Sequence, residues 1–187
     1  IGYTAAQSLT SGANNLAIGY EAMKVHTTGN RNMAIGYGVM NDTDAGSTSL
    51  GSSDNMFIGY DAGGGTWTNA VAQYNVGIGN YVMDAAIAGA EYNTAVGFNS
   101  LGAITSGAQN TALGTQAGQN ITTGTANITI GVQSGVTMTT TQYTVLIGHN
   151  AGTAINSTDA NGTIAIGYGA GSAITTGVGN VVLGYNA

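Results

Sequence analysis

Carboxylates are the side chains through which this chain could do chemistry. The 187 residues include eight Asp and Glu and no cysteine, so thiolate catalysis and disulfides are excluded. A retaining glycosidase needs two carboxyl groups about 5 Å apart. Asp84 with Glu91, or Asp54 with Asp61, could approach this spacing if successive segments stack, but eight acids will produce such near pairs by chance. We therefore expect no catalytic residues and no enzymatic activity.

One acidic segment has the spacing of a metal ligand set. Asp42-Thr43-Asp44-Ala45-Gly46 is similar to the start of a calcium loop, in which alternate carboxylates and a glycine turn surround a hard cation. The bidentate Glu that completes such a loop is missing. Asp42 and Asp44 are therefore candidate metal ligands, and a solvated acidic loop is the alternative. The glycines of the chain lack the context of a phosphate-binding loop, so no cofactor is expected.

The only tryptophan is a candidate contact residue. Trp67 follows Gly63-Gly64-Gly65-Thr66, a segment that reads as a loop. Exposed aromatic side chains stack on sugars or anchor interfaces, so we consider Trp67 a candidate surface contact. A loop tryptophan folded back over the protein is the alternative.

All of these candidate residues belong to a chain built from a short sequence repeat, so the fold of the repeat determines where they lie. A motif centred on a branched aliphatic residue followed by glycine has eleven copies, and six of the ten intervals between the motif glycines share the shortest length, that from Gly2 to Gly19. The motif glycines are Gly2, Gly19, Gly36, Gly59, Gly79, Gly97, Gly114, Gly131, Gly148, Gly167 and Gly184. A fixed period with occasional insertions indicates a solenoid, in which no single coil can bury its apolar face alone.

The period predicts fold class and domain organisation together. We expect an all-β protein, a parallel β-solenoid or β-roll of about eleven coils with a repeat of ~17 residues, forming one domain over residues 1–187. The longer intervals predict insertion loops at about 41–54, 63–74 and 153–162. At about 4.8 Å per coil, His26 and His149 lie about seven coils apart, which prevents a shared metal or catalytic site.

The repeated motif is apolar on both faces. In Asn32-Met33-Ala34-Ile35-Gly36-Tyr37, strand alternation places the bulky residues on one face and the small residues on the other. A strand with two apolar faces is typically covered on both sides. Only one face of a thin roll can point inward, so the other face predicts contact with another chain.

Asparagine and glycine recur at fixed places in the repeat. Asparagine stands four residues before the motif glycine in eight copies, and Thr144 and Thr163 replace it in two others. Stacked coils would join these amides in a hydrogen-bonded ladder or use them as turn caps. The positions predicted to be structural are represented by Asn15, Ile18, Gly19, Asn32, Ile35, Gly36, Asn110, Gly114, Gly131 and Gly167.

A second repeated feature is a row of threonines. Threonine stands nine residues before the motif glycine in all six of the shortest intervals, at Thr10, Thr27, Thr105, Thr122, Thr139 and Thr175. The following residue is Ser or Thr, and in five of the six a glycine comes next. This pattern predicts a turn, in which the glycine supplies a positive φ, and coils of two or three short strands.

Charge excludes several classes of partner. Charged residues make up 5% of the chain, against about 25% in an ordinary soluble domain, and Lys24 and Arg31 are the only basic residues. With a net charge of −6, the chain lacks the basic clusters that nucleic acid or an anionic membrane requires. Asn, Thr and Gly interrupt every apolar run, so we expect no membrane insertion.

The repeat resembles a known group of sequences. Gly29-Asn30-Arg31-Asn32-Met33-Ala34-Ile35-Gly36-Tyr37 and Gly107-Ala108-Gln109-Asn110-Thr111-Ala112-Leu113-Gly114 are similar to the Asn-x-x-Ala-Ile-Gly repeats of trimeric autotransporter adhesin heads and of bacteriophage tail fibres. The likeness covers nearly the whole chain. In the adhesin family such repeats form a left-handed parallel β-roll with three chains side by side. The resemblance therefore implies a side-by-side homotrimer and an extracellular location.

Two departures favour the tail-fibre version. The repeat is somewhat longer than the adhesin coil, and the tyrosine after the glycine is more regular. We expect a structural shaft segment of a longer trimeric phage tail fibre, involved in host attachment through a cell-surface glycan or receptor. The alternatives are a bacterial surface adhesin head, a self-assembling extracellular filament, and a monomeric solenoid that binds ice or polysaccharide through its threonine row.

Overall fold

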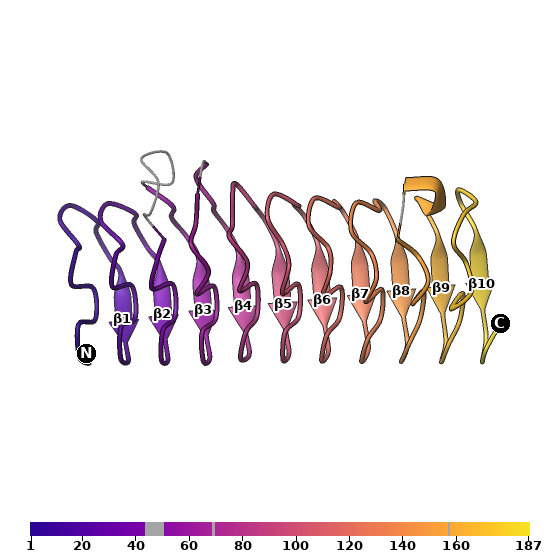
Figure 1. Cartoon of the computed structure of the whole chain (residues 1–187), viewed down its shortest axis with the longest axis horizontal. Helices are drawn as coiled ribbons and strands as arrows, with labels where there is room; N and C mark the ends of the chain where they lie inside the picture. Colours follow the sequence, from indigo (N-terminus) through magenta and orange to yellow (C-terminus); the bar gives the residue numbers. More distant parts are fainter. Residues whose placement is uncertain (44–50, 69, 157) are drawn as a thin grey trace.

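The chain winds as a solenoid, and its strands form one parallel sheet. The computed structural model describes residues 1–43, 51–68, 70–156 and 158–187. Its strands lie side by side in sequence order, each parallel to the next (Figure 1). They are β1 (Leu16–Ile18), β2 (Met33–Ile35), β3 (Met56–Ile58), β4 (Val76–Ile78), β5 (Thr94–Val96), β6 (Thr111–Leu113), β7 (Ile128–Ile130), β8 (Val145–Ile147), β9 (Ile164–Ile166) and β10 (Val181–Leu183). The predicted all-β parallel solenoid with a repeat of ~17 residues is confirmed.

The number of coils is slightly smaller than predicted. Ten copies of the motif each supply one strand of three residues, which makes about nine turns from β1 to β10. The eleventh copy, Ile1-Gly2, has no strand, although the amino group of Ile1 donates a hydrogen bond of 2.6 Å to the carbonyl of Ala17. The third insertion contains a short 3-10 helix, η1 (Thr158–Ala160). Figure 1 places η1 and the second insertion along the same edge of the solenoid.

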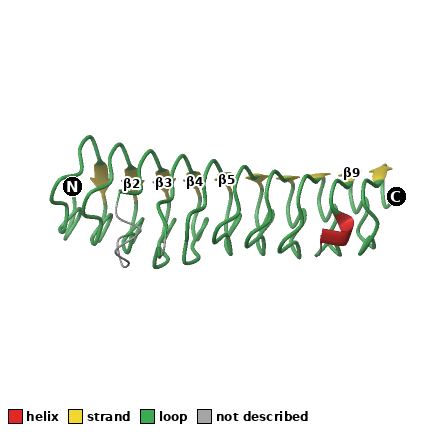
Figure 2. Cartoon of the chain, turned by 90° about the horizontal axis from the view of Figure 1, so that it is seen from above, coloured by secondary structure: helices red, strands yellow, loops and turns green. Residues whose placement is uncertain are grey.

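The strand register lines up equivalent residues in columns that run along the solenoid axis. Ala17 pairs with Ala34, and Ala34 with Phe57, and the same registration continues to Val182. The middle residue of each strand points inward, whereas the first and third residues point away from the core. Figure 2 shows the strands along one side of the solenoid and the turns along the other. The small residue of the motif therefore faces the core, and the larger aliphatic residues face outward.

Left-handed backbone closes every coil. The motif glycines have φ near +134°, and residues such as Glu21, Met23 and Arg31 repeat three further left-handed positions in coil after coil. Asparagine and glycine adopt this conformation readily, whereas larger residues do so at a cost. These corners limit each coil to one short strand among the described residues, in place of the two or three that we expected.

In four of the five Thr-[Ser/Thr]-Gly turns, the glycine has a different role from the predicted one. Gly177 has the predicted positive φ, +100°, whereas Gly12, Gly29, Gly107 and Gly124 do not adopt a positive φ. A Cβ atom at Gly124 would lie 2.5 Å from the carbonyl oxygen of Thr141 in the next coil. Glycine is needed here because the coils approach closely, and not because of the backbone angle.

Core side chains compensate one another in size, within some coils and between neighbouring coils elsewhere. The middle strand residue packs near the residue four places after the motif glycine. Ala17 is combined with Met23, whereas Leu146 is combined with Gly152. A Cβ atom at Gly152 would lie 2.7 Å from Leu146 Cδ1, so a larger residue has no room there. Ala112 and Gly118 are both small, and there Leu101 of the preceding coil occupies the space, 3.0 Å from a Cβ atom at Gly118.

Trp67 belongs to this core, and its prediction as a surface contact is wrong. The side chain is completely buried, its ring meets Phe57 edge to face at 5.9 Å, and its Nε1 donates a 3.0 Å hydrogen bond to the carbonyl of Gly63. Trp67 lies eight residues after its motif glycine, where Ile87 stands in the next coil. The insertion therefore returns to the core position that an aliphatic residue fills elsewhere.

Gly77→Ala tests the size compensation around Phe57. A Cβ atom at Gly77 would lie 2.5 Å from Phe57 Cδ1 and 3.1 Å from Val82 Cγ1. We expect Gly77→Ala to destabilise the chain by about 1–3 kcal/mol through overpacking, and Phe57→Ala by about 3–5 kcal/mol through the cavity. The double variant should lose less than the sum of the two, as measured by urea unfolding. Additive losses would show that the two positions do not compensate each other.

Candidate functional site

The outer face of the sheet is an uncovered apolar surface. Each of the ten strands contributes its first and third residues, and all of these twenty residues except Thr94 and Thr111 are apolar. None of the twenty is buried, and Leu113 is 48% exposed. No pocket was found among the described residues. The surface is suited to contact with another extended surface and not to enclosing a small molecule.

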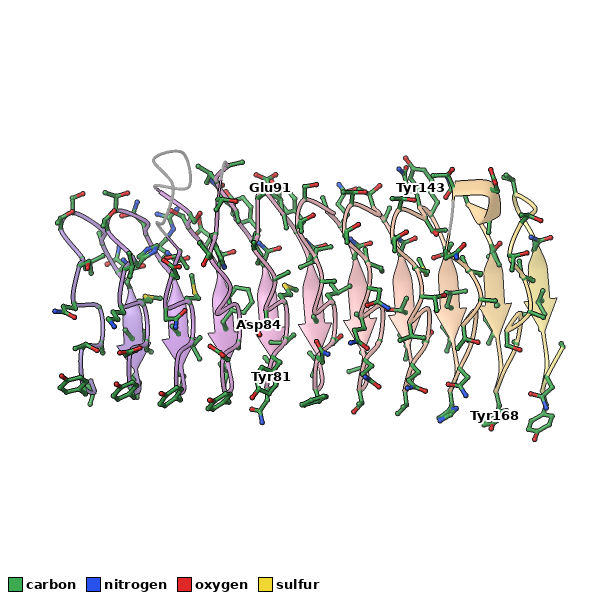
Figure 3. The ribbon with its side chains drawn as sticks, viewed as in Figure 1. Tyr81, Asp84, Glu91, Tyr143 and Tyr168 are labelled. Carbon is green, nitrogen blue, oxygen red and sulfur yellow. The ribbon has the colours of Figure 1, made fainter. Side chains whose placement is uncertain are left out.

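A row of aromatic rings borders this face where the strands end. We call the residues immediately after the motif glycines the tyrosine edge. Tyr3, Tyr20, Tyr37 and Tyr60 stack with centroid separations of 5.4, 4.8 and 5.1 Å. Figure 3 shows Tyr168 on this side of the solenoid, where it stacks on His149 at 5.2 Å. Because the rings cover one another's faces, the edges and hydroxyl groups remain for contact with a partner.

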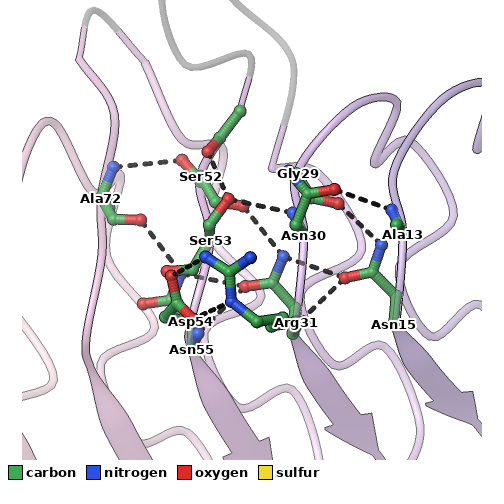
Figure 4. Close-up of polar contacts among 12 residues, drawn as sticks. Ala13, Asn15, Gly29, Asn30, Arg31, Ser52, Ser53, Asp54, Asn55 and Ala72 are labelled. Carbon is green, nitrogen blue, oxygen red and sulfur yellow. Dashed lines mark hydrogen bonds and ion pairs between the residues drawn. The ribbon is translucent and has the colours of Figure 1, made fainter.

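A second row borders the face where the strands begin. We call the residues five places before the motif glycines the corner column, since they have left-handed backbone. Arg31 binds Asp54 in the next coil through two hydrogen bonds of 2.6 and 2.8 Å (Figure 4), and Tyr74 stacks on Tyr92 at 4.9 Å. The Arg31 guanidinium holds the pKa of Asp54 below its ordinary value. The members are Asn14, Arg31, Asp54, Tyr74, Tyr92, Gln109, Ala126, Tyr143, Gly162 and Gly179.

The predicted asparagine ladder lies next to the corner column and is confirmed. The backbone N–H and Nδ2 of Asn110 both donate to Asn93 Oδ1 at 3.0 Å, and Nδ2 also donates to the carbonyl of Gly124 at 2.9 Å. The same contacts recur from Asn15 to Asn127, and Figure 4 shows part of this series. Thr144 continues the ladder, because its Oγ1 donates to Asn127 Oδ1 at 2.8 Å. These amides hold the coils together and are not exposed to a ligand.

The threonine row also forms hydrogen bonds between neighbouring coils. Thr10, Thr105 and Thr122 each donate their hydroxyl proton to a backbone carbonyl of the following coil, at 3.0, 3.1 and 3.2 Å. The hydroxyl protons are therefore used within the chain. This leaves only acceptor capacity on these hydroxyls for an outside ligand.

The acidic residues pair differently from the two pairs considered from the sequence. Asp54 binds Arg31, whereas Asp61 and Asp84, from successive coils, both lie against Gly64. Burial, reinforced by the charge of Asp61, raises the pKa of Asp84 to about 6, although a hydrogen bond from the Gly64 backbone acts in the opposite direction. Burial also raises the pKa of Asp61.

The candidate metal ligands and the histidines do not form a site among the described residues. Asp42 Oδ2 accepts a 2.7 Å hydrogen bond from Thr66, and Asp44 lies outside the described residues. His26 is buried, with Nδ1 2.8 Å from Thr43 Oγ1, whereas His149 is exposed on the tyrosine edge. In the part of the chain that the structure describes, no three His, Cys, Asp or Glu residues are grouped as a metal site requires.

Asp84→Asn should change the pH dependence of stability. With a folded pKa of about 6 and an ordinary value of 3.8, the folded chain holds the Asp84 proton more tightly than the unfolded chain does. The free energy of unfolding should therefore fall as pH rises from about 4 to about 6. Because Asp84 is half-exposed, we expect a gain of only about 1 kcal/mol for Asp84→Asn at pH 7.5.

Urea unfolding of the wild-type chain and Asp84→Asn at pH 4 and pH 7.5 checks this expectation. The two proteins should be equally stable at pH 4, where Asp84 is protonated, and differ at pH 7.5. Asp159→Asn, at an exposed residue of η1, is the control for the loss of one charge. An equal gain from both substitutions would show that net charge, and not the site at Gly64, is responsible.

The geometry defines the class of this protein as a parallel β-solenoid with a flat apolar face between two bordering rows. Comparisons with family models, curated proteins and solved structures found no match. No helix among the described residues is long and apolar enough to cross a membrane.

Proposed function

We propose that this chain is a structural, non-enzymatic shaft segment of an extracellular homotrimeric fibre of the phage tail-fibre kind, which takes part in host attachment through a glycan or receptor. The observation that supports this best is the uncovered apolar outer face. A shaft needs stiffness along its length, and the continuous sheet and asparagine ladder provide it.

The size of the outer face fits a stable interface. Ten strands extend about 45 Å along the axis, and the seven positions from the corner column to the tyrosine edge span at most about 20 Å. The product is at most about 900 Å² per chain. In a trimer each chain shares this area between two neighbours, so its two contacts together, and not each one, reach the roughly 800 Å² per partner of a standard interface. The strands alone would give about half of that area, so the tyrosine edge and the corner column must also contribute to the interface.

Three copies are favoured over two by the likeness of the repeats to those of trimeric fibres. A bacterial adhesin head or a surface filament would cover the same face in the same way, so these remain the related alternatives. A monomeric ice- or polysaccharide-binding solenoid is less well supported. It would need free hydroxyl groups, whereas those of Thr10, Thr105 and Thr122 bind the next coil.

Light scattering behind a sizing column tests the proposal. We expect the wild-type chain to have three times the mass of the monomer. Leu113→Lys places a charge in the middle of the outer face, where the leucine is already half-exposed, and should give a monomer with an unchanged circular dichroism spectrum. Thr123→Lys, an exposed position outside that face, should remain trimeric. A folded wild-type monomer would overturn the proposal.

A further inference from the structure

In six of the ten coils, the two rows that border the outer face carry residues that complement each other in size, polarity or aromatic character. We infer that neighbouring copies pack parallel and in register, with the tyrosine edge of one copy against the corner column of the next. This inference rests on the proposed self-association, and it specifies which residues of a second copy meet. Around an axis parallel to the solenoid, neighbouring faces meet edge to edge, and equivalent coils lie at the same height.

Size is the first kind of complementarity. The coils that carry Gly162 and Gly179 in the corner column carry Tyr168 and Tyr185 on the tyrosine edge. In a parallel, in-register pair, each of these tyrosines meets a position that has no side chain. An antiparallel pair would place tyrosine edge against tyrosine edge, with one ring opposing another and no small residue to receive it.

Polarity is the second kind of complementarity, and it fixes the register of neighbouring copies along the solenoid axis. The coil of Gly114 combines Gln109 in the corner column, Thr111 on the strand and Thr115 on the tyrosine edge. The next coil combines Ala126 with Val132, and both are apolar. A slip of one coil would bring Val132 against Gln109 or Tyr143, and would separate the polar residues from one another. In-register packing keeps polar residues together and apolar residues together.

Aromatic residues are the third kind. The coil of Gly97 combines Tyr92 with Phe98, and the coil of Gly148 combines Tyr143 with His149. All four side chains are exposed in the single chain. Paired across neighbouring copies, they would form ring contacts that add to the burial of the aliphatic stripe.

Cysteine cross-linking tests the inference, because the chain has no cysteine of its own. In the variant Ala126→Cys/Val132→Cys, the two thiols stand on opposite borders of one coil, with the strand Ile128–Ile130 between them and at most about 20 Å apart, so a short bismaleimide is expected to join them only between chains. The matched control is Ala126→Cys/Phe98→Cys, whose cysteines lie in the same two rows but two coils apart. The third variant is Val132→Cys alone.

We expect the in-register pair to give at least tenfold more covalent trimer on denaturing gels than the control pair, with no product from Val132→Cys alone. Equal cross-linking of the two pairs, a covalent dimer of Val132→Cys, or no product from the in-register pair in a sample that is trimeric by light scattering would overturn the inference and leave the proposed function standing. A monomeric wild-type chain would overturn both.

Discussion

Gly114→Ala is expected to lower the free energy of unfolding by about 3 kcal/mol. Gly114 has φ +134°, which an alanine adopts at a cost of about 1–2 kcal/mol. In addition, a Cβ atom there would lie 2.7 Å from the carbonyl oxygen and 2.8 Å from the carbonyl carbon of Gly131 in the next coil. Relief of this contact requires the coils to separate, which adds about 1–3 kcal/mol of overpacking.

Urea unfolding followed by circular dichroism measures the loss, and Gly51→Ala separates its two causes. Gly51 also has a positive φ, +90°, but no atom lies within 4 Å of a Cβ atom there, and the residue is outside the outer face and its two bordering rows. Gly51→Ala should therefore cost about 1–2 kcal/mol, the backbone contribution alone. Equal losses for the two variants would show that backbone angle, and not the spacing of the coils, makes the motif glycine necessary.

Asn110→Asp is expected to destabilise the chain by about 3–5 kcal/mol. The carboxylate keeps the acceptor for Asn127 but lacks the Nδ2 donor, so Asn93 Oδ1 loses its side-chain donor and the carbonyl of Gly124 loses its partner. Asn110 is 1% exposed, so the new negative charge is also removed from water. Because coils unfold in small groups in repeat proteins, the urea midpoint and native-state hydrogen exchange should both be measured.

The chain itself supplies the control for this substitution. Thr144 occupies the equivalent position and keeps two hydrogen bonds to Asn127 Oδ1, from its backbone N–H at 3.1 Å and from Oγ1 at 2.8 Å. Asn110→Thr should therefore lose about 1–2 kcal/mol. If Asn110→Asp were no worse than Asn110→Thr, the amide donors would not be what holds neighbouring coils together.

The sequence predicts this fold well because nearly every structural requirement recurs with the same period. The motif glycine has a close contact with its equivalent in the next coil, so it reappears at each copy and reveals the register. The asparagines can be recognised in the sequence for the same reason, because each one accepts hydrogen bonds from the asparagine of the next coil and so recurs with the same period. A structural requirement that recurs in every coil therefore selects the same residue type in most copies of the repeat, and such residues can be identified from the sequence alone.

Features that depend on a single coil could not be predicted in this way. The insertion around Trp67 has no second copy to show that its path returns to the core. The proximity of Asp61 and Asp84 was also missed, although counting from Gly59 and Gly79 places both near Gly64, a coil position without a side chain. The left-handed positions of Glu21 and Met23 carry only a partial signal in residue type. Glycine or asparagine occupies the equivalent positions in about half of the coils, such as Asn150 and Gly152, whereas the fold imposes a positive φ on Glu21 and Met23 themselves.

The size compensation in the core also determines how such a chain can lengthen or shorten during evolution. Between Gly97 and Gly148 the coils are uniform in length, so loss or duplication of one whole coil keeps every position of the repeat aligned. The core residues of neighbouring coils must still fit each other, because the space for the Phe57 ring is provided partly by Gly77 and the space for Leu101 partly by Gly118. Each of these pairs must be inherited together, so the shaft can gain or lose a coil only where the newly adjacent residues match in size.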